Sequence, residues 1–404
     1  MKQTACALVL GGFVNGYSII RELSAKGVSD IWLFDTNKSL GSYSNKIKGF
    51  VLLDSTAQSL LTAIESLHQT YDKIVLFPTN DVHLEQLHEL SDRIADYCFL
   101  PFHKHNLLQS LGKVHQYQQC EACGVPYPAS VDLQRPEQLE RVRELPYPVL
   151  IKPNKRDDLT SDLFRSLVLQ SDEDLHEHQA MLSGYLAQGI SFLASEIIPG
   201  ECSNIFAYFG YRNKNGQILN EWIGGKLSQY PNRFGVFSTA SNHAPREVLE
   251  QGRRLLEFMD LHGILEPEFK YDPRDGRYKL MEINLRSAMW NRVGYLTGVD
   301  IAHTQYLDAL GEPVARQEQR RDFNLHYVYV KHELFGMLQG TISWTTFWHN
   351  LFASDQTCFA VFDPSDVKPF LVDFWRSTRG LFKGALKKLR TKKRKRSVMS
   401  ACYK

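Results

Sequence analysis

Two strand-like runs on either side of an Asp-Gly turn constrain the fold of this chain more than any other feature. The runs cover residues 268–272 and 281–286, and Gly276 lies in the turn between them. Alternating polar and apolar residues on both sides of such a turn predict a β-hairpin.

Three oxygen-bearing side chains are expected on one face of this hairpin, because side chains alternate along a strand. They are Glu268, Glu282 and Asn284. Mg²⁺ prefers hard oxygen ligands and bridges phosphates, so the set predicts a magnesium–nucleotide site. Arg286 belongs to the same face and would reach a transferring phosphoryl group. Charged strand faces also occur on ordinary solvated hairpins, and spacing leaves that alternative open.

The composition indicates a globular protein of two or three domains. The chain has 404 residues, 43% hydrophobic and 23% charged, which suffices for sizeable cores. No apolar stretch is long enough to span a bilayer, and the N-terminus leads into an apolar strand, so we expect a cytoplasmic protein. Seven scattered cysteines fit a reducing compartment, and the Cys-x-x-Cys at Cys120 lacks a second pair for zinc.

Basic residues are concentrated at the C-terminus. Twelve of the 47 Lys and Arg, but none of the 45 Asp and Glu, lie from Arg376 onwards, which leaves 35 bases and 45 acids in residues 1–375. Leucines and a phenylalanine recur there at helical spacing, which predicts an interfacial helix over residues 376–396 on an anionic membrane, at the inner face of the cytoplasmic membrane. We consider nucleic acid a less favoured partner, because no aromatics interleave the basic run. A solvated, disordered tail is the third alternative.

The first hundred residues alternate between strands and helices. Buried-strand patterns cover residues 5–10, 31–35 and 74–77, and a helical pattern covers 17–26. This order predicts a doubly wound α/β domain over residues 1–105.

Two segments of this domain are candidates for ligand contact. The glycine turn at residues 11–16 is either an anion cradle at a helix N-terminus or simply a tight turn. Asn80 and Asp81 follow a strand at the edge where open α/β sheets bind ligands. Asn80 is equally well placed to cap a helix.

The next region carries two lysines in unusual places. Lys113 opens a helix, and Lys152 ends an apolar strand, where a lysine is costly unless it meets an anion. Both are candidates for binding phosphates. The strand pattern at residues 192–201 ends in Pro-Gly and would offer backbone groups to an adenine, with Glu201 near a ribose.

Taken together and in this order, these segments resemble the ATP-grasp superfamily over residues 1–312. The matching motifs are Leu111-Gly112-Lys113, Ile151-Lys152-Pro153, Ser195-Glu196-Ile197-Ile198-Pro199-Gly200, Glu268-Phe269-Lys270 and Met281-Glu282-Ile283-Asn284-Leu285-Arg286. The resemblance implies an ATP-grasp unit over residues 106–312. A C-terminal extension over 313–375 and a basic tail over 376–404 would follow it.

The resemblance also implies roles for individual residues. The phosphates of ATP would meet Lys113 and Lys152. The adenine would be held by Ser195, Glu196, Ile197 and Ile198, and the ribose by Glu201. Mg²⁺, or Mn²⁺ in its place, would be held by Glu268, Glu282 and Asn284. Arg286 would stabilise phosphoryl transfer as the catalytic arginine.

Within the superfamily, residues 225–235 and 363–371 are similar to carboxylate–amine ligases of the D-aspartate ligase group. This looser similarity implies that a small carboxylate is activated as an acyl phosphate and joined to an amine on a cell-envelope precursor or polysaccharide. Lys226, Tyr230 and Arg233 are our candidates for binding the carboxylate, although a basic strand-turn face is the alternative reading. Residues 154–161 depart from the group's pattern, because its phosphate-covering loop is glycine-rich and this segment contains no glycine.

Several questions stay open at the level of sequence. Asp35, Asp81 and the histidines are possible general bases. The aromatics near Trp344 and Trp348 predict a core, with a membrane-contacting patch as the alternative. A non-catalytic ATP-binding adaptor and a nucleic-acid-associated protein are the competing functions. The oligomeric state is not predicted.

Overall fold

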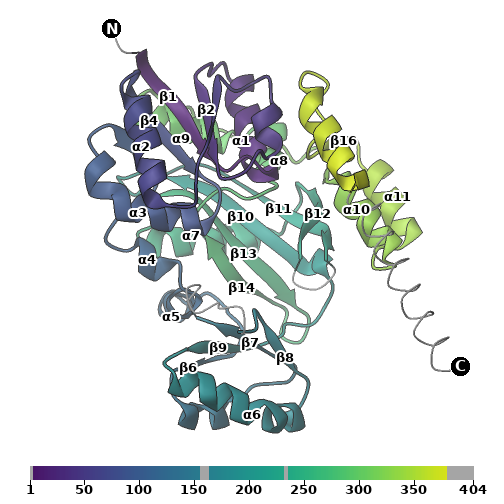
Figure 1. The fold of residues 1–404 in the computed structure, drawn as a ribbon. Helices are drawn as coiled ribbons and strands as arrows, with labels where there is room; N and C mark the ends of the chain where they lie inside the picture. Colours follow the sequence, from purple (N-terminus) through teal and green to yellow (C-terminus); the bar gives the residue numbers. More distant parts are fainter. Residues whose placement is uncertain (1–2, 155–162, 232–234, 380–404) are drawn as a thin grey trace, which may run out of the picture.

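The chain forms three β-sheets that follow one another along the molecule. The structure, a computed structural model, describes residues 3–154, 163–231 and 235–379. In Figure 1 the N-terminal sheet lies at the top, the large central sheet lies in the middle, and a small lobe lies below.

The N-terminal sheet has five parallel strands in the order β3-β2-β1-β4-β5. The strands are β1 (Gln3–Leu10), β2 (Ile31–Asp35), β3 (Gly49–Leu52), β4 (Tyr71–Pro78) and β5 (Cys98–Phe99), and the helices are α1 (Val14–Ala25), η1 (Leu40–Tyr43), α2 (Ala57–His68) and α3 (Asp81–Ile94). Leu8 and Leu10 share a core with α2 and α3, whereas Ala7 and Val9 share one with α1. Both faces of the sheet are therefore covered, which explains the continuous apolar run of β1 and confirms the predicted doubly wound domain.

The two candidate ligand-contact segments of this domain are held by internal hydrogen bonds. Asn80 caps α3, because its side chain accepts from the His83 amide at 2.9 Å. Gly11 has a positive φ of 81°, as the tight turn requires. The Gly12 amide, which an anion cradle would offer to a phosphate, instead donates to Asp35 Oδ2 at 2.8 Å. This observation favours the tight turn over the cradle.

The central sheet has seven strands in the order β14-β13-β10-β11-β12-β15-β16. The strands are β10 (Ile205–Arg212), β11 (Ile218–Tyr230), β12 (Val236–Ser241), β13 (Gly263–Asp272), β14 (Arg277–Asn284), β15 (Leu325–Val328) and β16 (Gln356–Phe359). The helices of this region are α4 (Leu107–Ser110), α5 (Lys113–Cys123), α7 (Arg246–Phe258), α8 (Arg292–Leu296), α9 (Ile301–Leu310), α10 (Val330–Leu338) and α11 (Trp344–Phe352). All pairings are antiparallel except that of β15 with β16.

The predicted hairpin is formed by β13 and β14. Glu268 lies directly opposite Glu282, and Glu266 lies opposite Asn284. Gly276 closes the turn with a positive φ of 71°, and its amide donates to the Asp272 carbonyl.

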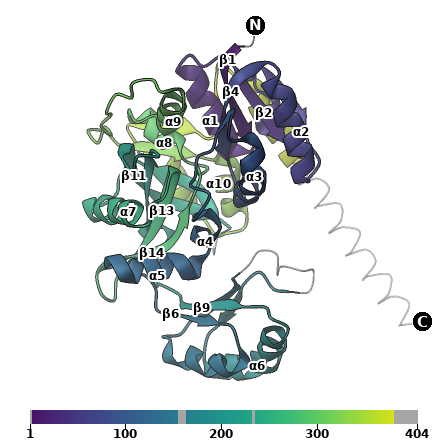
Figure 2. The same ribbon diagram turned by 90° about the vertical axis from the view of Figure 1, so that its left-hand side faces the viewer.

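The small lobe is a four-stranded antiparallel sheet in the order β6-β9-β7-β8, covered by helices. Its strands are β6 (Ser130–Leu133), β7 (Val149–Pro153), β8 (Leu167–Leu169) and β9 (Phe192–Glu196), and its helices are η2 (Pro136–Glu144) and α6 (Asp172–Ala187); η3 (Cys202–Asn204) leads back to the central sheet. The lobe has a hydrophobic core of its own. Figure 2 shows α5 between the lobe and the central sheet.

The C-terminal extension completes the central sheet with β15 and β16 and adds α10, α11 and a helical segment over residues 367–379. The predicted aromatic core is right for Phe347, which is buried, but wrong for Trp344 and Trp348, which are 61% and 42% exposed. The reason is that α11 buries only the stripe that contains Phe347 and Asn350. Within the described residues, no helix combines the length and the apolar character needed to cross a membrane.

Candidate active site

The two hairpin carboxylates predicted as metal ligands each pair with a lysine from another element. Lys113, the first residue of α5, donates to Glu282 Oε2 at 2.8 Å and to the Met281 carbonyl at 3.2 Å. Lys226 of β11 reaches past β10 and donates to Glu268 Oε2 at 2.5 Å. The hairpin therefore brings together two carboxylates and two ammonium groups.

Neighbouring charges and burial together shift the pKa values of these groups. Lys113 lowers the pKa of Glu282 to about 2, against the opposing effect of burial. Burial alone would lower the pKa of Lys226, but the Glu268 carboxylate raises it above its ordinary value. Burial and the neighbouring charge of Lys113 lower the pKa of Lys152, while Glu282 opposes that shift. Both lysines predicted to bind phosphates thus act electrostatically on Glu282.

Asn284 and Arg286 extend this charged face toward the N-terminal sheet. Asn284 Nδ2 donates to Glu266 Oε2 at 2.9 Å, so its Oδ1 is directed away from that carboxylate. Arg286 Nε donates to Asp81 Oδ1 at 2.8 Å, which joins the hairpin to the first residue of α3. Asp81, a sequence candidate for substrate contact, therefore orients the candidate catalytic arginine.

Glu266 belongs to the same face, but the sequence reasoning missed it. Its side chain is only 2% exposed, and its second oxygen accepts from Trp290 Nε1 at 3.0 Å. Burial and the charge of Glu268 raise the pKa of Glu266 to about 8. The signal was present, since Glu266 stands two residues before Glu268 on the same strand and must share its face.

The polar face of the hairpin lines a cavity of about 520 Å³ between the hairpin and the N-terminal sheet. The hairpin wall carries Glu266, Glu268, Glu282, Asn284 and Arg286. The opposite wall carries Asn15, Asp35, Asn37, Asn80 and His83. Burial lowers the pKa of His83 to about 4, so this imidazole is neutral at physiological pH. The cavity is large enough for a small-molecule ligand.

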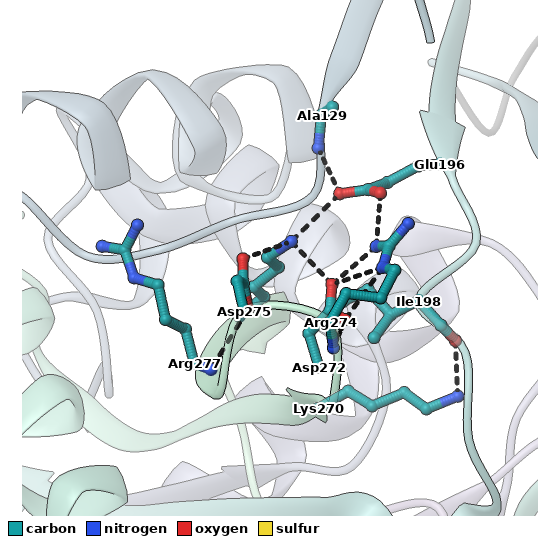
Figure 3. Close-up of polar contacts among 9 residues, drawn as sticks. Ala129, Glu196, Ile198, Lys270, Asp272, Arg274, Asp275 and Arg277 are labelled. Atoms are coloured by element: carbon teal, nitrogen blue, oxygen red, sulfur yellow. Dashed lines mark hydrogen bonds and ion pairs between the residues drawn. The ribbon is translucent and has the colours of Figure 1, made fainter. Parts of the chain in front are cut away.

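The segment predicted to hold adenine is clamped to the tip of the same hairpin (Figure 3). The Glu196 carboxylate is buried and accepts from the Ala129 amide at 3.0 Å, from Arg274 Nη2 at 2.5 Å and from Lys279 Nζ at 3.3 Å. Asp272, which is fully buried, accepts from the same two cations at 2.6 and 2.7 Å.

Backbone groups of this segment are also engaged. Lys270 Nζ donates to the carbonyls of Ile198 and Gly200, both at 2.8 Å. The Ile197 amide donates to the Pro148 carbonyl at 2.9 Å. Ser195 pairs with Leu150 inside the small-lobe sheet. The side chain of Glu196 therefore fixes the segment in place and does not face the cavity.

Of the remaining predicted residues, some line the cavity and others lie away from it. Glu201 is exposed at the start of η3. Lys226 lines the cavity, but Tyr230 turns away: its hydroxyl accepts from Gln339 Nε2 at 2.7 Å and its ring packs against α10 at Phe335. Arg233 lies outside the described residues, as do residues 155–161 of the segment predicted to cover the phosphates.

The oxygen-bearing side chains of the hairpin face fit a divalent cation in their chemistry, although lysines engage two of them. Across residues 3–154, 163–231 and 235–379, no three or more His, Cys, Asp or Glu side chains are grouped so that they could hold a metal ion. Glu268 and Glu282 are each engaged by a lysine, and the third expected ligand is an amide. Two carboxylates and an amide oxygen nevertheless match the hard-oxygen chemistry of Mg²⁺.

Comparisons with known proteins agree with this architecture. No known family's sequence profile matches the chain. A D-aspartate ligase of Enterococcus faecium (strain Aus0004) is 27% identical over 244 residues, which are 57% of this chain and 57% of that protein. The chain thus matches little more than half the length of this curated relative.

Two solved structures illustrate the similarity of fold. An N5-carboxyaminoimidazole ribonucleotide synthetase bound to ADP superposes with a TM-score of 0.62 at 16% identity, over 84% of this chain and 85% of that one. An L-amino acid ligase from Bacillus licheniformis gives a TM-score of 0.58 at 14% identity, over 80% and 79%. The predicted ATP-grasp fold is confirmed, as is the resemblance to D-aspartate ligase.

Proposed function

We propose that this chain, which has the ATP-grasp fold, is an ATP-dependent carboxylate–amine ligase that forms an amide bond through an acyl phosphate. The observation that carries the proposal is the facing pair Glu268 and Glu282, each with its own lysine, at a cavity shared with the N-terminal sheet. A carboxylate is a poor electrophile, and phosphorylation supplies a leaving group that an amine can displace.

Glu268, Glu282 and Asn284 Oδ1 would hold Mg²⁺ or Mn²⁺. When bound, the metal neutralises negative charge on the transferring phosphoryl group. Lys113 and Lys226 pair with the two carboxylates. With nucleotide and acid bound, Lys113 would pair with a phosphate oxygen and Lys226 with the carboxylate of the acid, which would leave Glu268 and Glu282 to hold the metal. Each lysine thus has an anionic partner in both states, as a buried charge requires.

Lys113 and Lys152 are the proposed phosphate ligands. Their mutual repulsion, which contributes to the lowered pKa of Lys152, would be relieved by an anion bound between them. The backbone of residues 195–198 is the proposed adenine edge, held in position by the buried Glu196 carboxylate. Glu201 is exposed beside it and would face the ribose.

Arg286 would stabilise the phosphoryl group in transfer, since Asp81 fixes its guanidinium at the cavity. Lys226 and Arg233 are the proposed ligands of the acid substrate, whereas Tyr230 is left out because it packs on α10. The match to D-aspartate ligase supports an amino acid as the acid substrate. We propose that the acceptor amine belongs to a cell-envelope precursor.

The C-terminal extension would bring the chain to an anionic membrane surface. Trp344 and Phe352 on α11 are 61% and 70% exposed, and Trp375 in the helical segment 367–379 is 60% exposed. The basic run of the sequence follows directly, from Arg376 on. Exposed aromatics beside basic residues are typical of interfacial binding.

Vesicle sedimentation tests this membrane contact. We expect the full chain to sediment with phosphatidylglycerol vesicles but not with phosphatidylcholine vesicles. A chain that ends at Arg379 should lose most of this binding. Equal binding to both lipids, or unchanged binding after the truncation, would contradict the proposed contact with an anionic membrane.

Hydroxylamine trapping tests the ligase reaction itself. Purified protein, Mg-ATP and D-aspartate, followed by a panel of other amino acids, should give a hydroxamate that depends on both ATP and the acid. Glu282→Gln should abolish it, whereas Glu257→Gln, which alters an exposed residue of α7, should not. ATP binding without any hydroxamate would favour a non-catalytic adaptor.

A further inference from the structure

We propose that Glu266 binds the ammonium group of the acid substrate, so that the cavity selects amino acids over simple carboxylic acids. The proposal rests on the ligase function for the reaction that follows, but substrate binding can be measured without catalysis.

The three hairpin carboxylates differ in the partners that neutralise them. Glu268 pairs with Lys226, and Glu282 pairs with Lys113. The hydrogen bonds of Glu266 come from two neutral donors, Asn284 Nδ2 at 2.9 Å and Trp290 Nε1 at 3.0 Å. No lysine, arginine or histidine in the described part of the chain forms an ion pair with it.

An ionised carboxylate in this environment needs a cation. Glu266 is 2% exposed, and a buried charge that meets only neutral donors is poorly compensated. A carboxylate offers about four lone-pair positions, of which the two neutral donors use two. Glu266 also lines the cavity. A ligand that brings an ammonium group would therefore stabilise the ionised form of Glu266, which has no cation paired with it in the described part of the chain.

The position of Glu266 along β13 fits the amino group of a substrate. Lys270 binds the small-lobe segment at Ile198, Glu268 follows toward the N-terminal sheet, and Glu266 comes next. Arg286, beyond Asn284 on β14, is already held by Asp81 of the N-terminal domain. Glu266 therefore lies on the side of the carboxylate pair that faces away from the nucleotide lobe, where the acid would approach.

Asp35 on the opposite wall is the competing ammonium site. Its two oxygens already accept backbone amides, from Gly12 at 2.8 Å and from Asn37 at 3.2 Å. Asp35 is also more accessible than Glu266, so water can solvate its charge. An ammonium group would therefore stabilise the carboxylate of Asp35 less than that of Glu266.

Calorimetry in the presence of Mg²⁺ and a non-hydrolysable ATP analogue tests the proposal. Amino acids of both configurations, beginning with D-aspartate, are each compared with the same acid without its amino group, which is succinate for aspartate. We expect the wild-type chain to bind its preferred amino acid roughly 10²-fold more tightly than the partner acid. Glu266→Gln should reduce that ratio at least roughly tenfold, and Glu266→Asp should retain part of it.

Glu333→Gln is the matched control, because Glu333 is also a fully buried carboxylate held by neutral donors. Its partners are Ser228, Ser238, Thr239 and Asn350, away from the cavity. This variant should keep the wild-type ratio, even if its stability falls. The affinity of Glu266→Gln for the ATP analogue should stay within about twofold of wild type, since the ammonium site is separate from the nucleotide.

Four results would overturn the proposal. The first is an unchanged ratio of amino-acid to partner-acid affinity in Glu266→Gln, and the second is a loss of that ratio in Asp35→Asn alone. The third is a lower affinity of Glu266→Gln for the ATP analogue, and the fourth is a wild-type chain that binds no amino acid. A reduced ratio without any hydroxamate in the trapping assay would instead refute the ligase reaction and leave the ammonium site standing. The two failures are therefore distinguishable.

Discussion

Similar numbers of acidic side chains gather at the two ends of the β13–β14 hairpin, but they are neutralised differently. At the tip, Glu196 and Asp272 each contact both Arg274 and Lys279 (Figure 3). Asp275 also pairs with Lys279, at 3.0 Å. Every one of these three acids therefore has a cationic partner, and Asp272 has no exposed surface.

At the cavity end, the carboxylates are only partly neutralised. Glu268 and Glu282 have one lysine each, and Glu266 has neutral donors alone. The groups also face a cavity of about 520 Å³. Both ends of the hairpin are rich in charged side chains, so charge alone does not distinguish a structural cluster from a binding site. The distinguishing feature is a carboxylate that has no cationic partner among the described residues and faces a cavity.

The largest effect is expected from Glu282→Gln. The change removes a proposed metal ligand and the partner of Lys113, so ATP-dependent hydroxamate formation should fall by about 10²–10³-fold. The free energy of unfolding in urea should change far less. Activity within tenfold of wild type would mean that the open end of the hairpin is not the reaction centre.

The next largest effect is expected from Asp272→Asn at the closed end. Removing this carboxylate leaves Arg274 and Lys279 with one acid fewer, and the free energy of unfolding should fall by about 2–3 kcal/mol. If Asp272→Asn instead loses as much activity as Glu282→Gln while its stability is unchanged, the tip of the hairpin would have a role in the reaction and not in stability.

The stability cost of this substitution should depend on pH. The hydrogen bond from Arg274 holds the pKa of Asp272 below its ordinary value, against the opposing effect of burial. A depressed folded-state pKa stabilises the protein above the unfolded-state value of about 3.9 and loses that effect as pH falls below it. Unfolding curves of wild type and Asp272→Asn should therefore converge in acid.

A smaller effect of opposite sign is expected from Glu266→Gln without metal or nucleotide. Burial and Glu268 raise the pKa of Glu266 to about 8, so ionisation destabilises the fold as pH rises from the unfolded-state value of about 4.3. The variant should be about 1 kcal/mol more stable than wild type at pH 8 and should lose that advantage near pH 4. A less stable variant at pH 8 would mean that the bonds from Asn284 and Trp290 outweigh the buried charge.

The smallest effect is expected from Arg277→Ala. Arg277 is an exposed residue of the hairpin tip whose backbone amide donates to Asp275, and its side chain takes no part in the clamp around Glu196 (Figure 3). The free energy of unfolding should change by less than about 0.5 kcal/mol, whereas Arg274→Ala at the same tip should cost clearly more. Equal losses would show that general charge, and not the closed network, stabilises the tip.

The hairpin could be predicted from the sequence because its turn and its alternation specify one register. Counted from the turn, that register would place Glu268 opposite Met281. A register irregularity between Phe269 and Glu268 brings Glu282 opposite Glu268 instead, so this detail of the facing pair needed the structure. Alternation along the strand also puts Glu266 on the face of Glu268, although Glu266 lies outside the matching motif.

Two other placements needed tertiary structure. Alternation from Lys226 puts Tyr230 on the same face, but irregularities in the pairing of β11 with β12 near Ser228 disturb the alternation and leave Tyr230 on α10. In α11, Trp344 and Trp348 form an apolar face as regular as that of Phe347. Helical periodicity identifies both faces and does not say which one meets the sheet.

The late position of β15 in the chain has a consequence for synthesis on the ribosome. Among the described residues, the edge of β12 that faces away from β11 pairs with β15 alone. The chain between Ser241 and Leu325 takes about 4–17 s to translate at roughly 5–20 residues per second. During that interval the nascent central sheet presents an open edge, which is the form most prone to pair with another chain. A truncation before β15 would make this transient hazard permanent, so the C-terminal extension also protects the newborn protein from aggregation.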